Sequence, residues 1–379
     1  MQKGDTGSKF THSIVYAAGA SMGAPLGGIL SDGIGWRWAF ILQTPLTALA
    51  ALIVTLALNS DVPQASPPSS PSPTRWASNL RKVDFLGALT LVLAVFTLLI
   101  AVDRGSNVAW RDTTTLACLL LSLPLSVAFI YIEMRVARHP FAPGHVIFDR
   151  SLFASYACNF FAMASLHGLH YLQAVDGMSA TAAGTRLVPG MLCSVAGSLF
   201  GGWRMQRTGR YYWLTTGCLA MSVAGTAVVF VCSGPAVSDT WGVILGLGVA
   251  AFGAGAAITT TLINVIANAS AQDQAIATAC SYLFRSLGSV VGISVAATVL
   301  QQSLRTRLIE TLDSGEEADR IVEGVKKSLE FIKELEPAVR TLVRECYQLA
   351  TNAAFGLGVA LIVCSWVSAC FIREKRLSI

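Results

Sequence analysis

The sequence predicts an all-α integral membrane protein, a bundle of about ten transmembrane helices. Hydrophobic residues make up 53% of the chain and charged residues only 13%, about half the charged share of a soluble domain. Ten apolar stretches reach the roughly 20 residues that cross a bilayer. They lie near 11–32, 38–58, 84–102, 114–132, 151–173, 184–203, 212–232, 241–267, 275–300 and 350–372.

Polar segments between these stretches divide the chain into five parts. Residues 1–58 hold two helices, and residues 59–83 form a Pro/Ser-rich linker whose composition predicts an exposed hinge. Residues 84–300 hold seven helices. Residues 301–348 form a charged loop, and residues 349–379 hold the last helix and a basic tail.

Basic residues gather in alternate loops, which fixes a predicted orientation. The linker, the segment 133–150, the turn 204–210 and the tail are all rich in Arg and Lys. The positive-inside rule therefore places both chain ends in the cytosol. The loop 301–348 has eight basic and ten acidic residues, and long loops translocate largely regardless of charge. Its helix-periodic apolar residues predict an amphipathic helix on the non-cytosolic side.

A small-residue stripe dominates the first apolar stretch. Gly19, Gly23 and Gly27 recur every fourth residue, so another helix can approach closely along this face. Pro25 lacks the N–H that bonds back one turn, and Gly28 adds freedom, so a bend is expected here. The alternative is that these glycines only allow helices to pack and have no role in transport.

The stripe is part of a longer pattern. Together with the Gly-Trp-Arg-Trp-Ala-Phe run at 35–40, it resembles the antiporter signature of the major facilitator superfamily. Further stretches, at 82–87, 171–175, 179–184 and 187–189, are similar to the fourteen-helix drug:proton antiporter branch of fungi. The resemblance implies a major facilitator-type helical bundle. It places the stripe on the fifth helix, so that residues 1–58 are a remnant of the amino-terminal half, helices one to four are missing and the chain is truncated.

A second stretch resembles the superfamily's cytoplasmic gating loop. Gly202, Arg207, Gly209 and Arg210 match the pattern Gly-x-x-x-Asp-Arg-x-Gly-Arg, while Gln206 stands where the acid would be. The alternative is a basic turn that only sets topology.

Polar residues at membrane depth are costly and are therefore candidates for a substrate or proton pathway. Arg285 lies far from both ends of its apolar stretch, and its surroundings, Tyr282 to Val290, resemble those in vacuolar basic amino acid transporters. Asn159, His170 and Gln173 lie along the stretch 151–173, where Asn159 and His170 share a helix face. A structural ion pair at Arg285 and a hydrogen-bonded core histidine are the alternatives. Asp84, Asp103 and Glu133, at stretch ends, are expected to be solvated.

The resemblance implies a proton-coupled antiporter of small cationic solutes such as basic amino acids, in the vacuolar membrane. Multidrug or toxin efflux at the plasma membrane and a non-transporting truncated membrane protein remain alternatives. The expected partners are a small-molecule substrate and the lipid bilayer, with oligomeric state left open, and nothing in the sequence indicates nucleic acid. No metal or cofactor is expected, the proton gradient being the energy source. An enzyme is not expected, since Ser21 in Gly-x-Ser-x-Gly lies in an apolar helix rather than a strand–turn–helix.

Overall fold

The computed structural model describes residues 26–27, 29–30, 33–58, 84–107, 110–136, 143–165, 180–234, 239–270, 272–311, 324 and 336–375. Within these ranges the regular structure is helical throughout, and six helices are long and apolar enough to cross a membrane. The helices are α2 (Trp36–Leu58), α4 (Phe85–Asn107), α5 (Thr113–Tyr131), α6 (Gly144–Ile147), α7 (Arg150–Ala164), α9 (Ala180–Thr208), α10 (Tyr212–Cys232), α11 (Thr240–Asn268), α12 (Gln274–Thr311) and α15 (Pro337–Ala369). A π-helical turn, η1 (Ile132–Val136), extends α5.

Nine of the ten predicted stretches coincide with a described helix at least in part. The prediction of an all-helical membrane bundle is thereby confirmed. The stretch 11–32, the first in the chain, lies almost wholly outside the described residues, so its helix stays a prediction.

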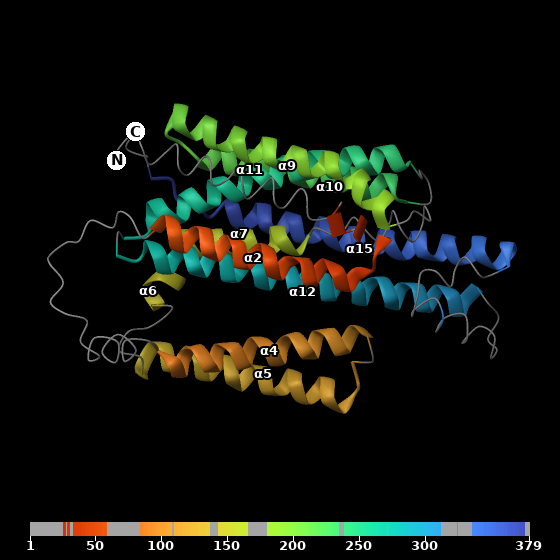
Figure 1. The fold of residues 1–379 in the computed structure, drawn as a ribbon, viewed down its shortest axis with the longest axis horizontal. Helices are drawn as coiled ribbons and strands as arrows, with labels where there is room; N and C mark the ends of the chain where they lie inside the picture. Colours follow the sequence, from red (N-terminus) through yellow and green to blue (C-terminus); the bar gives the residue numbers. More distant parts are fainter. Residues whose placement is uncertain are drawn as a thin grey trace.

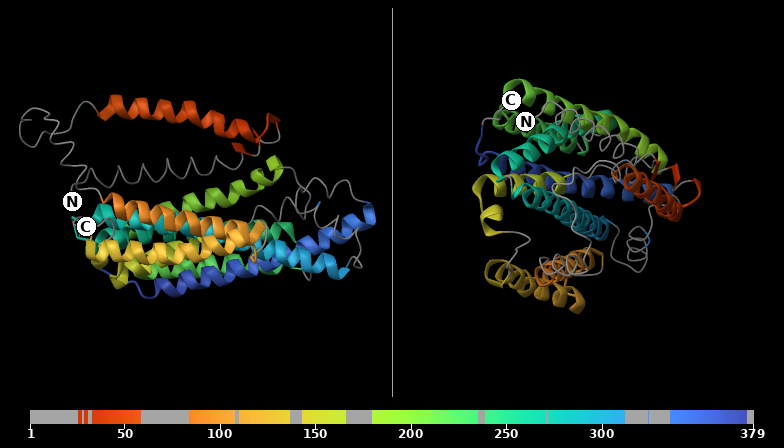
Figure 2. Two further views of the ribbon diagram at one scale, coloured as in Figure 1. Left: turned by 90° about the horizontal axis from the view of Figure 1, so that it is seen from below. Right: turned by 60° about the vertical axis from the view of Figure 1, so that its left-hand side comes forward.

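Six helices, α7, α9, α10, α11, α12 and α15, form what we call the carboxy-terminal bundle (Figure 1). Helix α11 lies between α9 and α10, while α7 packs against α12, α15 and α11. The hairpin of α4 and α5 lies to one side and contacts the bundle through α4 and α12. Helix α2 stands apart from these helices (Figure 2), and its described side chains are exposed although mostly apolar. Large exposed apolar surfaces of this kind suit a lipid environment.

Close helix contacts in the bundle depend on glycine. A Cβ on Gly288 of α12 would collide with the carbonyl oxygen of Phe160 on α7, and one on Gly292 would collide with the backbone of Ala164. Gly255 of α11 lies equally close to the carbonyl of Ser194 on α9. Because nothing larger than hydrogen fits there, the helix backbones touch, as small-residue interfaces in membranes allow.

Two helices reach beyond their predicted ends. Helix α12 continues to Thr311 and α15 begins at Pro337, so the expected loop limits of 301 and 348 both fall inside helices. Leu304, Leu308 and Val343 are buried in these extensions, which protrude past the other helices (Figure 2). Arginines interrupt the apolar residues of both extensions, so the sequence did not predict the extensions as parts of the transmembrane helices.

Pro337 is the first residue of α15. Proline is well accommodated at a first helical position, where its missing N–H would have no partner. The predicted amphipathic helix between the two extensions lies outside the described residues, apart from Gly324.

The glycine contacts give a first prediction. Gly288→Val should lower the free energy of unfolding in detergent by about 1–3 kcal/mol, because the side chain must push α12 away from α7. Gly217→Val is the matched control, since a Cβ there meets nothing within 4 Å. Thermal unfolding of the two purified variants checks this. Equal losses in both would mean that close approach of α7 and α12 contributes nothing.

Candidate functional site

Asn159 lies at the centre of a buried polar contact between three helices. Its side chain on α7 is 3% exposed. The amide Nδ2 donates to Ser281 Oγ on α12 at 3.1 Å, and the Oδ1 accepts from Thr261 Oγ1 on α11 at 3.0 Å. Both hydroxyl partners are buried as well. The amide therefore joins α7, α11 and α12 in the middle of the carboxy-terminal bundle.

The contact continues along the interface of α7 and α11. Ser151, Ser155 and Asn159 follow one another every fourth residue on α7, so they share a face. Asn264 of α11 donates through Nδ2 to the Ser151 carbonyl oxygen at 3.3 Å and to Ser155 Oγ at 2.5 Å. We call Ser151, Ser155, Asn159, Thr261, Asn264 and Ser281 the polar ladder.

Of this ladder, sequence reasoning selected only Asn159. The signal for the others was present: small polar residues at four-residue spacing on one apolar stretch, and Thr261 three residues before Asn264 on another. Serine and threonine are ordinary in membrane helices, so the spacing gains meaning only once the two stretches are known to be neighbours.

At one end of the ladder the carboxy-terminal tail is tied to α10. The buried Tyr211 hydroxyl donates to the Arg373 carbonyl oxygen at 3.2 Å and accepts from the Lys375 backbone N–H at 2.8 Å. Asn268 Nδ2 also donates to this hydroxyl, at 3.2 Å. Glu374 Oε1 accepts from the backbone N–H groups of Tyr211 and Tyr212 at 3.0 and 3.2 Å. A carboxylate at a helix N-terminus satisfies unpaired donors and suits the helix dipole. We call these contacts the tail clasp.

The residues that resemble the gating loop lie at the same end. Gly209 has a φ of +64° and its N–H donates to the Met205 carbonyl oxygen at 2.8 Å, so it terminates α9 in the left-handed conformation that favours glycine. The Arg207 guanidinium lies 4.6 Å above the Trp203 ring. Arg210 is exposed, and a Cβ on Gly202 would meet nothing within 4 Å. Gating itself stays a prediction for these residues.

Arg285 lies one turn beyond Ser281 on α12 and is half-buried. Its guanidinium carbon is 5.4 Å from the centre of the Tyr282 ring, on the same helix. Within the described part of the chain it makes no ion pair. The structural alternative weighed from the sequence, a fixed ion pair, thus has no support among these residues.

The remaining predicted site residues fall outside the described ranges. Of the stripe only Gly27 is described, and Gly19, Gly23, Pro25 and Gly28 are not. Helix α7 ends at Ala164, and His170 and Gln173 lie beyond the described residues. Their relation to Asn159 therefore stays a prediction.

One expectation about the acidic residues is wrong. Glu133 was expected to be solvated, but it is 7% exposed, in η1. Its Oε1 lies 3.3 Å from where a Cβ on Gly87 of α4 would be. The π-helical turn packs against α4, which removes this carboxylate from solvent. Asp84 caps α4 by accepting from Gly87 N–H at 2.9 Å, and Asp103 is exposed.

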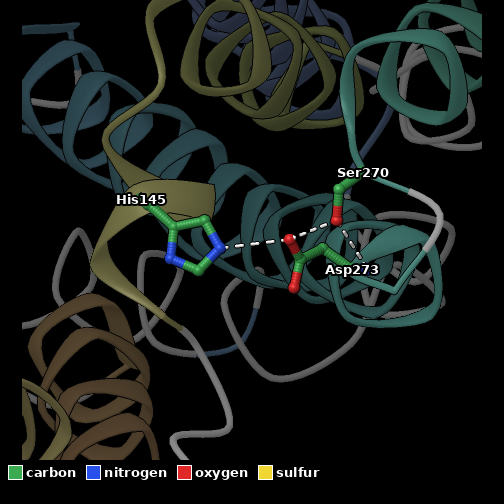
Figure 3. Close-up of polar contacts among 3 residues, drawn as sticks. All are labelled: His145, Ser270 and Asp273. Carbon is green, nitrogen blue, oxygen red and sulfur yellow. Dashed lines mark hydrogen bonds and ion pairs between the residues drawn. The ribbon is translucent and has the colours of Figure 1, made fainter.

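A second polar contact joins α6 to the turn between α11 and α12 (Figure 3). Asp273 Oδ2 accepts from Ser270 Oγ at 2.6 Å and lies 3.1 Å from His145 Nε2. The hydrogen bonds from Ser270 and then His145 hold the pKa of Asp273 below its usual value. Since the His145 side chain is 69% exposed, we regard the pair as a surface contact of small energetic weight.

Comparison with known proteins identifies the class. The model of the Major Facilitator Superfamily matches residues 11–293, and the chain belongs to this superfamily. The expected family is therefore confirmed: this is a multi-pass membrane protein of a transporter superfamily, whose relatives are named as transporters and not as enzymes.

Three relatives from yeasts are similar to most of this chain. The chain is 30% identical to the "Vacuolar membrane amino acid uptake transporter fnx2" of Schizosaccharomyces pombe over 96% of its own length and 62% of that protein. It is 29% identical to the "Multidrug resistance protein fnx1" of the same yeast, over 96% and 68%. It is 28% identical to the "Vacuolar basic amino acid transporter 2" of Saccharomyces cerevisiae, over 93% and 77%. The chain thus spans less than two thirds of the length of fnx2.

The tail clasp gives a second prediction. Tyr211→Phe removes the hydroxyl shared by Asn268, Arg373 and Lys375, so the free energy of unfolding should fall by about 1–3 kcal/mol. Trypsin should also cleave the tail after Arg373 faster in the folded protein. Tyr212→Phe is the control, because among the described residues that hydroxyl makes only a 3.5 Å contact with the Cys370 carbonyl. Identical cleavage rates in both variants would show that the clasp does not hold the tail.

Proposed function

We propose that this chain acts in the proton-coupled antiport of small cationic solutes, such as basic amino acids, across the vacuolar membrane. The observation that carries the proposal is Arg285, a half-buried charge in an apolar helix without an ion pair among the described residues. Such residues in membrane proteins mark solute or ion pathways. The printed names of two relatives support the substrate class and the membrane.

The arrangement of basic residues supports an orientation with both chain ends in the cytosol. The end of the bundle that carries the tail clasp also holds Arg150, Arg204, Arg207 and Arg210. Six Arg and Lys side chains gather there when Arg373 and Lys375 are included. The positive-inside rule makes this end cytosolic. A vacuolar antiporter so oriented would exchange a cytosolic solute for lumenal protons.

Efflux of drugs or toxins at the plasma membrane is the second candidate. It is favoured by the similarity to a protein named for multidrug resistance, which is almost as high as the similarity to fnx2. A non-transporting membrane protein is the third alternative. Purified protein that moves any solute against its gradient would exclude the third.

The proposal predicts lysine uptake into vacuolar vesicles that depends on an acidic lumen. A protonophore should abolish it, because the proton gradient supplies the energy. Arg285→Ala should reduce uptake at least about tenfold at equal protein level, since the loss of one charged hydrogen-bonding partner corresponds to that factor or more. Arg305→Ala, an exposed arginine in the α12 extension, is the matched control. Uptake by Arg285→Ala equal to that of the control would remove Arg285 from the pathway.

A further inference from the structure

Arg285 lies far from the start of α12. It lies eleven residues after Gln274, where α12 begins, which is about 16 Å along the helix. That is close to half of the roughly 30 Å hydrocarbon thickness. An arginine at this depth cannot easily extend to either surface, so its charge has to be compensated inside the protein or by water or a solute.

Helix α12 has one buried face and one exposed face. The face packed on α7 carries buried small residues, Ser281, Gly288 and Gly292. The opposite stripe carries Tyr282, Ser286 and other exposed residues. Arg285 lies at the border of the two faces and is half-buried. The residue is therefore partly covered by the bundle and partly exposed on the side of Tyr282 and Ser286.

The guanidinium of Arg285 suits a carboxylate partner. Guanidinium offers N–H donors in a fixed fork that matches a carboxylate with two parallel hydrogen bonds. Among the described residues the guanidinium contacts the face of the Tyr282 ring, which stabilises the cation, and its N–H donors make no hydrogen bond within that part of the chain. A second cation brought close to this charge without an anionic group would be repelled.

We propose that Arg285 binds the α-carboxylate of the transported solute and thereby selects amino acids over cations that lack a carboxylate. This rests on the proposed function and deepens it, because it names the part of the solute that is recognised. It also separates the two leading candidates, since a cationic drug without a carboxylate has no group for this arginine. Tyr282 acts as a positioning residue that holds the guanidinium toward the open stripe.

The test compares two solutes that differ in one group. Equilibrium binding of radiolabelled lysine and of cadaverine, which is lysine without its carboxylate, is measured on the purified full chain. The wild-type chain should bind lysine about ten- to a hundredfold more tightly than cadaverine. Arg285→Ala should lose this preference, with the affinity ratio falling to about one. Arg305→Ala should keep it.

Arg285→Lys adds a milder variant that keeps the charge. A point charge cannot make the paired hydrogen bonds, so the lysine preference should lie between those of the wild type and Arg285→Ala. Tyr282→Leu should weaken lysine binding, while Tyr282→Phe should not, since the ring alone positions the guanidinium.

The outcomes separate this inference from the function beneath it. If the wild-type chain binds lysine and cadaverine equally well, or if Arg285→Ala weakens both by the same factor, carboxylate recognition is wrong while cation transport stands. If the wild-type chain binds neither solute, the proposed function fails and the inference with it.

Discussion

An amide buried between apolar helices has to find its hydrogen-bond partners within the protein, and Asn159 finds them on two neighbouring helices. Its donor contacts Ser281 of α12 and its acceptor contacts Thr261 of α11. Neither partner can be lost without leaving a polar group unsatisfied where water is scarce. This contact fixes the rotation of three helices about their axes, and the position of Arg285 on α12 follows from it.

The rest of the carboxy-terminal bundle is consistent with that constraint. Glycines bring α12 against α7 so closely that short side chains such as serine can reach across the interface. At one end, Asn264 and Asn268 extend the polar contacts to Tyr211 and the tail. Helices α7, α10, α11 and α12 are thereby joined by hydrogen bonds as well as by packing. Such a unit suits a mechanism in which halves of a transporter rock as bodies around a midplane site.

The positions of nine described helices could be predicted from apolar stretches, because membrane helices have to be long and apolar. Their ends could not: Arg305 and Arg344 concealed the helical extensions of α12 and α15. The candidate site was predicted in part. Asn159 and Arg285 stood out as polar residues at depth, whereas Ser155 and Asn264 matter through partners on other helices, which one sequence does not reveal. Burial of Glu133 depends likewise on α4, a neighbour that the charge pattern cannot indicate.

The hydrogen bond between Asn159 and Ser281 is the contact whose measurement tests this account most directly. A double-mutant cycle with Asn159→Ala, Ser281→Ala and the double variant should be followed by unfolding of the purified protein in detergent. The account predicts a favourable coupling of about 0.6 kcal/mol and at most about 1.7 kcal/mol, the average and the maximum found for polar contacts between membrane helices. Strictly additive effects of the two substitutions would contradict it, because α7 and α12 would then be held together without this contact.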